Sequence, residues 1–199
     1  MSKTQLDYIF CPFCAKYLET MMEEGHELKY CRPCGWRHYL KHDMAVAGII
    51  IRHNTTSYIE PCSEVLMVLR NKEPNKGKWS FPAGFVNFGE HPDKALAREV
   101  SEETGLRVVR SKLIEEVVSD DDPRSPKQLS KFYKVFATGE VKIIDQEENA
   151  QITWWILDPR NPLPNIAWGN HRRLFRQIRD GRQLSDTVPD IGWWLSEVR

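Results

Sequence analysis

The stretch that decides the fold runs from Gly84 to Leu106 and reads GFVNFGEHPDKALAREVSEETGL. Proline is favoured at the first position of a helix and glycine just past its end, so Pro92 and Gly105 mark the two ends of one helix. At 3.6 residues per turn, one face of this helix is expected to be buried. That face consists of Leu96, Ala97, Val100 and Thr104.

Three glutamates lie on a neighbouring arc of the same helix. Glu99, Glu102 and Glu103 are three and four residues apart, so we expect their carboxylates to converge. Like charges at this spacing repel one another, and a bound cation would remove that penalty. Hard oxygen ligands suit Mg²⁺ or Mn²⁺, which also bind substrate phosphates. The arc also contains Ala95, which is small enough to leave room for a ligand.

The spacing of the whole stretch resembles the Nudix box, in which a glycine, five residues, a glutamate and seven residues precede REUxEExGU, with U aliphatic. Every defined position matches. An acidic helix face in solvent would not require these offsets. The resemblance implies an α/β/α sandwich with a mixed sheet. It also implies that the Gly84 carbonyl joins the three glutamates as a metal ligand, while Glu90 and Arg98 pair to support the loop against the helix.

The general base is less well defined by the sequence. Many Nudix relatives supply a further glutamate from a loop before the strand that here reads ITWW. The usual acidic position falls on Gln151, whose amide cannot act as a base. Glu147 and Glu148 lie a few residues earlier and Glu148 is a candidate. A helix glutamate acting through a metal-bound water, Glu103 or Glu99, is ranked ahead of it.

A second module is predicted over residues 1–40 from two CxxC pairs. Sixteen residues separate Cys11-Pro-Phe-Cys14 from Cys31-Arg-Pro-Cys34. Four thiolates at this separation can close around one tetrahedral Zn²⁺, and a site with no open position is structural. A doubled CxxC in a chain without an export signal favours metal over disulfides. The module resembles a zinc ribbon and is too small to bury a core without its metal.

The other residues of the ribbon leave two questions open. His26 and His38 are spare ligand candidates, although four cysteines suffice. Tyr30, Trp36 and Tyr39 favour docking of the ribbon on the main domain, while contact with nucleic acid is the alternative.

Residues 41–181 form the predicted Nudix domain, and residues 182–199 form a tail that packs on it or makes a dimer contact through Trp193 and Trp194. Hydrophobic runs and turn residues divide the domain into strands and a late helix. Strands are expected over 45–51, 64–70, 79–86, 106–118, 131–137 continued by 140–144, and 152–156, with a helix over 168–181 ended by Gly181.

Composition narrows the function classes. Lysine plus arginine and aspartate plus glutamate number 28 each, so bulk attraction to nucleic acid or an anionic membrane is disfavoured. No run of 18 apolar residues is present, and the N-terminus has no apolar signal core. We therefore expect no membrane partner and a cytoplasmic location. Homodimers are common among Nudix proteins, and a homodimer is possible here.

A zinc ribbon joined to a Nudix domain resembles NADH pyrophosphatase and its relatives. The SQPWPFP-like signature that accompanies nicotinamide specificity is absent after the box, where the chain reads LRVVRSKLIEEVVSDDDPRSP. We therefore expect hydrolysis of a pyrophosphate bond in an ADP-containing dinucleotide or ADP-sugar of the ADP-ribose, NADH or FAD type. Phe132, Tyr133 and Trp154 are candidates to stack the adenine or, alternatively, core residues.

Two other functions remain open at this point. A Nudix-fold sensor would bind a nucleotide without cleaving it, but it would not need all three box glutamates. An enzyme acting on capped RNA would use the ribbon as an RNA handle, and the arginines of the last helix keep that possibility open. These are Arg172, Arg173, Arg176 and Arg179.

Overall fold

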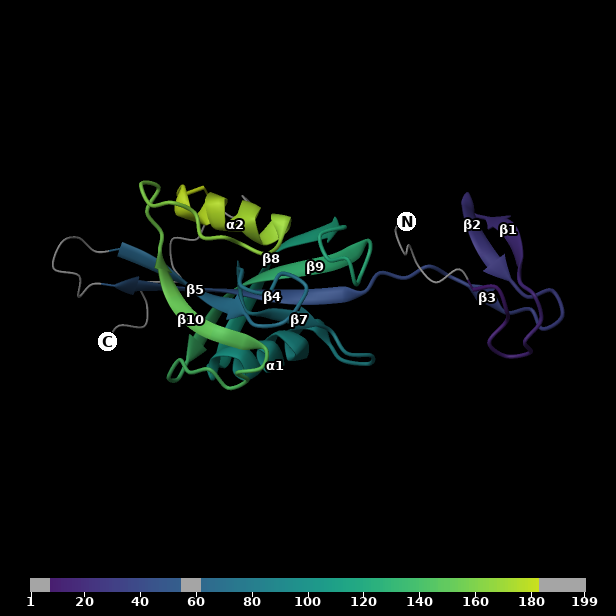
Figure 1. Cartoon of the computed structure of the whole chain (residues 1–199), viewed down its shortest axis with the longest axis horizontal. Helices are drawn as coiled ribbons and strands as arrows, with labels where there is room; N and C mark the ends of the chain where they lie inside the picture. The colour runs from purple at the N-terminus through teal and green to yellow at the C-terminus, as the bar shows by residue number, and fades with distance from the viewer. Residues whose placement is uncertain (1–7, 55–61, 183–199) are drawn as a thin grey trace. The chain divides into compact units, whose positions relative to one another are not determined.

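A computed structural model describes residues 8–54 and 62–182. The chain divides into two compact units, Met1–His42 and Asp43–Arg199 (Figure 1). Within the described residues, every helix is too short or too polar to cross a bilayer. Trp193, Trp194 and the rest of the tail beyond residue 182 lie outside the described residues.

The first unit contains a three-stranded antiparallel sheet. Strands β1 (Glu19–Glu23) and β2 (His26–Tyr30) form a hairpin, and β2 also pairs with the short β3 (Arg37–His38). The turn of the hairpin contains Glu24 and Gly25, both with positive φ, the conformation that a tight turn with glycine supplies. Two short strands therefore lie between the two CxxC pairs.

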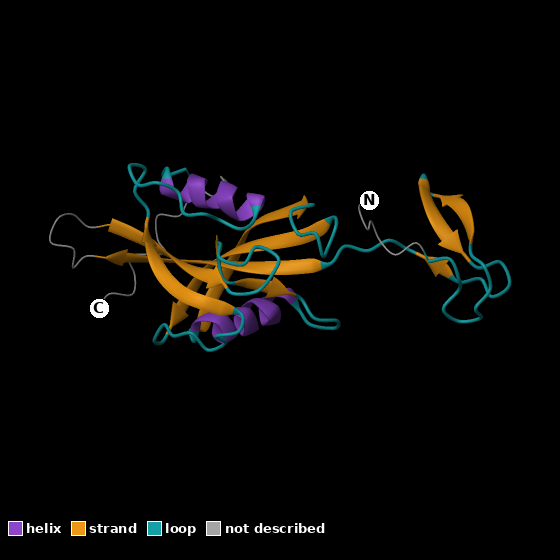
Figure 2. Cartoon of the chain, viewed as in Figure 1, coloured by secondary structure: helices purple, strands orange, loops and turns teal. Residues whose placement is uncertain are grey.

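The second unit is built on a seven-stranded mixed sheet (Figure 2). The main path runs β10-β5-β4-β9-β8, with β6 beside β5 and β7 beside β4. Only β4 and β9 run parallel among the pairings described. The strands are β4 (Met44–Asn54), β5 (Cys62–Arg70), β6 (Trp79–Ser80), β7 (Ala83–Phe85), β8 (Arg107–Ser119), β9 (Gln128–Thr138) and β10 (Asn149–Ile156).

The helices α1 (Pro92–Thr104) and α2 (Gly169–Arg179) cover opposite faces of this sheet (Figure 1). The apolar face of α1 packs through Leu96 and Val100 on Val46 and Ile50 of β4. On the other face, Leu174 and Phe175 of α2 pack with Ala47 and Ile49 of the same strand. Strand β4 is therefore buried on both faces, which accounts for its continuous apolar run AVAGIII.

The ends of α1 follow the local signals in the sequence. Pro92 is the first helical residue, and His91 before it accepts a hydrogen bond from Asp93 N–H through Nδ1, at 3.3 Å. Gly105 closes the helix with φ 72° and donates its N–H to Ser101 O. Ala95 differs from expectation, because it is fully buried in the core and leaves no room for a ligand.

One predicted strand was wrong. Residues 140–144 do not continue β9, because the chain turns at Gly139 with φ 117°. The segment instead crosses the end of α1, where Lys142 N–H donates to Thr104 O at 3.0 Å and Val141 packs on the core. The last helix ends at Arg179, two residues earlier than expected, and Asp180 caps it.

Candidate functional site

A cavity of about 290 Å³ opens where β7 pairs with the first residues of β4. Its floor is formed by small side chains, including Ala45, Ala47 and Ala83. One end is bordered by Glu99 and Glu102 of α1, and the other is bordered by the start of α2. The cavity therefore joins the box helix to residues that are distant in the sequence.

Arg98 organises the acidic end of the cavity. Its Nε and Nη2 donate to the two carboxylate oxygens of Glu90 at 3.0 and 2.9 Å, and Nη2 also donates to Phe85 O. Its Nη1 donates to Glu99 at 2.6 Å and to Glu102 at 3.0 Å. Hydrogen bonding from Arg98 holds the pKa of the Glu90 carboxyl below its usual value. The pairing implied by the Nudix resemblance is present, and it fixes the loop after β7 on the helix.

The Glu99 carboxylate occupies the space that a side chain at position 84 would need, so only glycine fits there. A Cβ at this position would lie 2.1 Å from the carboxylate carbon of Glu99 and from its Oε1. Gly84 pairs with Val46, whose side chain lies in the α1 core, so its open side faces the helix. Because Gly84 lacks a side chain, the Glu99 carboxylate can lie close to the Gly84 backbone.

Glu103 lies deeper than the other two box glutamates and does not line the cavity. It is 3% exposed, and its Oε2 accepts the Ala83 N–H at 2.8 Å. Burial raises the pKa of Glu103 to about 8, and the charge of Glu99 adds to this, while the hydrogen bond from Ala83 opposes it. Burial also raises the pKa of Glu99, against the effect of Arg98.

Glu99 and Glu102 converge on Arg98 Nη1, whereas Glu103 is directed to Ala83 N–H. Among the described residues, the four cysteines form the only cluster of possible ligand atoms that all lie within 4.8 Å of one another. Glu99 and Glu102 share the Arg98 guanidinium instead. Glu103 faces Ala83 N–H, because its position on the helix lies next to the buried residues Val100 and Thr104.

Glu148 also lines the cavity, and its negative charge contributes to raising the pKa of Glu99 and of Glu103. The turn before β10 holds it there, because Asp145 Oδ1 accepts the N–H groups of Glu147 and Glu148 at 2.8 and 3.1 Å. The Glu148 carbonyl in turn accepts the Asn71 N–H at 2.7 Å. Gln151 is exposed and donates to Thr153. Of Asp145, Glu147 and Glu148 in this turn, only Glu148 lines the cavity.

Several cavity residues were not predicted from the sequence. Arg70 at the end of β5 is buried, donates to Pro74 O and stacks over the Trp168 ring at 5.3 Å. Arg124 pairs with Asp122 and lies 5.4 Å from the Phe85 ring centre. Other residues missed were Asp121, Gln128, Ser130, Asn170 and His171. They come from separate loops and element ends, so no spacing in the sequence connects them.

The three aromatic candidates for adenine stacking are core residues. Phe132 and Tyr133 are buried, and Trp154 packs against the α1 core with Arg52 4.2 Å from its ring centre. The lining of the cavity includes none of them.

The donor set at the acidic end fits a hard divalent cation. Carboxylates and a backbone carbonyl are the ligands that Mg²⁺ and Mn²⁺ prefer. Gly84 brings its backbone to the Glu99 carboxylate, because any Cβ would fill this space. The candidate metal ligands are Gly84, Glu99, Glu102 and Glu103, and Glu148 lines the same cavity.

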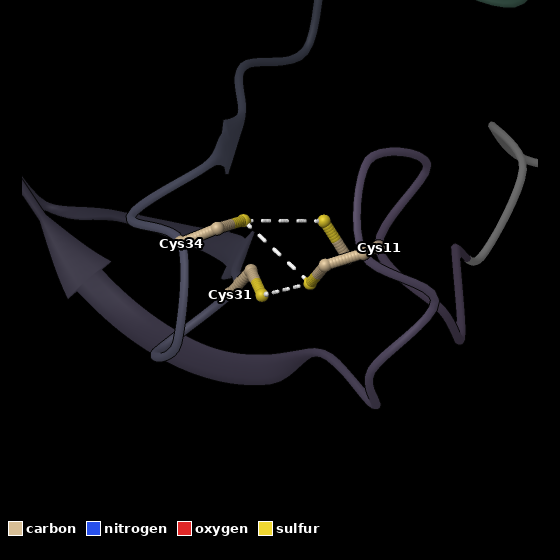
Figure 3. A group of neighbouring side chains, drawn as sticks. Cys11, Cys31 and Cys34 are labelled. Atoms are coloured by element: carbon tan, nitrogen blue, oxygen red, sulfur yellow. Dashed lines mark hydrogen bonds between the residues drawn. The ribbon is translucent and has the colours of Figure 1, made fainter.

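The four cysteine sulfurs of the first unit lie together, and Figure 3 shows those of Cys11, Cys31 and Cys34 directed toward one another. The sulfur atoms are 3.3 Å apart for Cys14–Cys31, 3.5 Å for Cys11–Cys34 and 3.7 Å for Cys14–Cys34. A disulfide would need about 2.05 Å, whereas sulfurs bound tetrahedrally to zinc at about 2.3 Å lie about 3.8 Å apart. The separations therefore fit a metal site.

The two cysteine turns have the same backbone structure. In each turn the first cysteine carbonyl accepts an N–H four residues on, from Ala15 and from Gly35. Each turn ends at a residue with a left-handed backbone conformation, with φ 55° at Ala15 and 75° at Gly35. His38 stacks on Trp36 and is not part of the cluster, nor is His26. Four cysteines thus complete the donor set.

Comparisons with known proteins agree with the architecture. A family model described as NUDIX domain matches residues 41–177. An ADP-ribose pyrophosphatase from Methanocaldococcus jannaschii is 32% identical over 143 residues, covering 71% of this chain and 75% of that protein. The NAD-capped RNA hydrolase NudC of Klebsiella pneumoniae is 29% identical over 144 residues, covering 68% of this chain. The chain spans about half, 54%, of the length of that relative.

A solved structure shares the fold at lower identity. The crystal structure of a NUDIX hydrolase from Nitrosomonas europaea superposes with a TM-score of 0.61 at 20% identity, covering 87% of this chain and 93% of that one. The expected sandwich fold and the assignment as a Nudix pyrophosphohydrolase are confirmed. With its box helix, mixed sheet and matched residues 41–177, the chain belongs to the NUDIX domain family.

Proposed function

We propose that this protein hydrolyses the diphosphate bond of an ADP-containing substrate, with ADP-ribose as the first choice. The observation that carries the proposal is the cavity that joins Glu99 and Glu102 of the box to residues at the start of α2. Such a cavity can hold a diphosphate at one end and a second moiety at the other. The names of the relatives, ADP-ribose pyrophosphatase and NAD-capped RNA hydrolase, support substrates of this class.

The acidic end is the proposed site of chemistry. A divalent cation bound there would neutralise charge on the diphosphate and make a bound water more acidic. Glu99, Glu102, Glu103 and the Gly84 carbonyl are the proposed ligands. Arg98 orients Glu99 and Glu102 through its Nη1 and holds the loop after β7 through Glu90 and Phe85 O. In this proposal, the main contribution of the protein is to position the oxygen atoms that would bind the cation.

Glu148 is the proposed general base. It lines the cavity, and no described residue donates a hydrogen bond to its carboxylate. A carboxylate oxygen of Glu148 can therefore accept the proton of the attacking water. Glu103 is less suited to this role than the sequence suggested, because Ala83 N–H engages its Oε2 and the side chain is buried. We therefore place Glu148 ahead of Glu103 as the proposed base, and Glu99 acting through a metal-bound water is the alternative.

A substrate panel tests the proposed function. Wild-type protein with Mg²⁺ is incubated with ADP-ribose, NADH, FAD, a dinucleoside polyphosphate and an NAD-capped RNA, and products and binding are measured for each. We expect ADP-ribose to be hydrolysed with the highest kcat/KM. Tight binding without turnover of any substrate would favour a nucleotide sensor. A clear preference for the capped RNA would favour the RNA-processing alternative.

We also propose that Cys11, Cys14, Cys31 and Cys34 hold one structural Zn²⁺, which supports the hairpin of β1 and β2. Purified protein is expected to contain one zinc per chain. Cys31→Ser should lose the zinc, because Cys31 is fully buried within the cluster. Metal analysis checks the content, and proteolysis should then cleave the first unit. Cys62→Ser is the matched control and should keep its zinc, since Cys62 lies at the start of β5.

Three further assignments are part of the same proposal. The zinc ribbon ends near residue 40, the protein acts in the cytoplasm, and it can form a homodimer. Nucleic acid is not a partner in this proposal, because three of the four α2 arginines are engaged within the protein, whereas Arg176 is exposed. Arg173 pairs with Glu115 on β8, Arg172 donates to Ile166 O, and Arg179 pairs with Asp180.

A further inference from the structure

The cavity has a second wall, far from the box glutamates in the sequence. Gln128 and Ser130 at the start of β9, together with His171 in the first turn of α2, line this side. These three residues, here called the polar wall, are only 8%, 6% and 5% exposed. None of the three has a fully enclosed polar atom without a partner, so the polar atoms that make no hydrogen bond within the protein open on the cavity.

The pairing of the strands places the polar wall on the α2 side of the sheet. Ala45 of β4 lies between Phe85 of β7 and Ser130 of β9, and residues opposite one another point to the same face. Ala47, two residues on, belongs to the core under α2. Gly84 and Val46 point to the other face, beside Glu99. A ligand would therefore pass the end of β7, from the acidic end to the polar wall.

The protonation of His171 follows from its contacts. Its Nδ1 accepts the Phe81 N–H at 3.2 Å, so this nitrogen carries no proton. The ring stacks on Phe81 and meets the edge of Phe132. Burial, together with the charge of Arg70, lowers the pKa of His171 to about 3. The ring is therefore neutral and carries its proton on Nε2, for which the described residues offer no acceptor.

Gln128 and Ser130, like His171 Nε2–H, have polar atoms available to a ligand. No hydrogen bond from either side chain to another described residue is seen, although both are buried polar groups on the cavity. Gln128 can donate and accept, Ser130 can donate and accept, and His171 Nε2 can only donate. All three groups are uncharged. They suit a neutral ligand with several hydroxyl groups better than they suit a phosphate, which favours cationic donors.

A sugar fits this wall better than a base. Bases are recognised by stacking on aromatic faces. The two aromatic side chains that line the cavity, Phe85 and Trp168, each have a guanidinium over the ring, from Arg124 and Arg70. The cavity floor beside Ser130 is formed by alanines rather than rings.

We propose that Gln128, Ser130 and His171 form a subsite for the hydroxyl groups of a sugar attached directly to the diphosphate, on the side away from the adenosine. This inference rests on the proposed hydrolysis of ADP-linked substrates and narrows it to ADP-sugars such as ADP-ribose. A dinucleoside polyphosphate with more than two phosphates places a further phosphate at this position, whereas FAD places the hydroxyl groups of its ribityl chain there. Turnover of the dinucleoside polyphosphate is therefore weaker than that of ADP-ribose.

The test compares two substrates that differ only at the proposed subsite. ADP-ribose carries the distal sugar, and the methyl ester of ADP carries a methyl group on its terminal phosphate instead. Both release AMP when the diphosphate is hydrolysed with water, together with ribose 5-phosphate or methyl phosphate. Gln128→Leu removes the amide at similar size. His171→Asn removes Nε2–H but keeps an oxygen near the Nδ1 position to accept the Phe81 N–H.

Each variant is expected to lower kcat/KM for ADP-ribose about tenfold, as for the loss of one hydrogen bond to a neutral group. Hydrolysis of the methyl ester should change less than twofold. Gln177→Leu in the last turn of α2, outside the cavity, is the matched control and should leave both substrates unaffected. Thermal unfolding confirms that the variants are folded.

Two outcomes would overturn the subsite. An unchanged kcat/KM for ADP-ribose would show that the polar wall does not touch the sugar. An equal fall on both substrates would place the adenosine, which they share, at the wall. Failure of the wild type to hydrolyse either substrate would contradict the proposed function instead. Calorimetric titration with ribose 5-phosphate then still tests the wall, since the two variants should bind it about tenfold more weakly than the wild type, and equal binding would overturn the subsite.

Discussion

Glu103→Gln is expected to lower kcat/KM for ADP-ribose by at least about a hundredfold, the scale seen when one preorganised electrostatic group is removed from an active site. The glutamine oxygen can still accept the Ala83 N–H that Glu103 Oε2 accepts at 2.8 Å. Its amide nitrogen replaces the other carboxylate oxygen and is no ligand for a hard cation. The substitution therefore removes one oxygen ligand for the cation while the side chain keeps its size and its hydrogen bond to Ala83.

The magnitude is measured by steady-state kinetics in Mg²⁺, with thermal unfolding as the test of folding. Glu140→Gln is the matched control, because Glu140 is exposed in the loop after β9 and does not line the cavity. It should retain full activity. A Glu103→Gln protein that is folded and keeps more than a tenth of wild-type activity would remove Glu103 from the proposed set of metal ligands.

Gly84→Ala is expected to have the second large effect, a loss of kcat/KM of about a hundredfold with little loss of stability. The added Cβ would lie 2.1 Å from the Glu99 carboxylate, so the two cannot keep their positions. The carboxylate is the far end of a flexible side chain and can move away. Glu99 would then leave its contact with Arg98 at 2.6 Å and its place beside the Gly84 backbone.

A double-mutant cycle tests this explanation of the glycine. If Gly84→Ala acts by displacing Glu99, it should cost little more in a protein that already carries Glu99→Ala, because residues in contact are not additive. Activity is measured for both single variants and the double variant. Additive losses would mean that Gly84 acts independently of Glu99. A folded Gly84→Ala protein with near wild-type activity would contradict the close packing.

The features predicted well from the sequence are those encoded by neighbouring residues. Pro92 and Gly105 mark the two ends of α1, and the helical period identifies Leu96 and Val100 as buried. The two CxxC pairs predict the cysteine cluster, because each knuckle is a local turn with its own hydrogen bonds. The family follows from the spacing of the box, and the NUDIX match confirms it.

The features that were missed depend on tertiary packing. Gln128 and His171 are 43 residues apart in the sequence, and they line one cavity because β9 pairs in parallel with β4 and α2 packs on the same face. In the sequence, Arg70 is only the last residue of a predicted strand, and its role in the cavity depends on its contact with the distant Trp168. Glu103 was expected on the acidic arc of the helix, and its burial beside Val100 and Thr104 was not predicted.

The expected continuation of β9 shows the same limit. Residues 140–144 have a strand-like composition, but the positive φ at Gly139 turns the chain toward the end of α1. A hydrogen bond to Thr104 O then holds Lys142 there. Propensity in a short segment is a weak signal, and packing against a neighbouring helix decides the outcome.

The most direct test of the central claim is product analysis of ADP-ribose incubated with the purified wild-type protein and Mg²⁺. Cleavage of the diphosphate by water must give AMP and ribose 5-phosphate in equal amounts, and a chelator of divalent cations should stop their release. Equal release of both products, lost with the chelator, is the predicted result. Intact ADP-ribose after prolonged incubation, or AMP release that the chelator leaves unchanged, would contradict it.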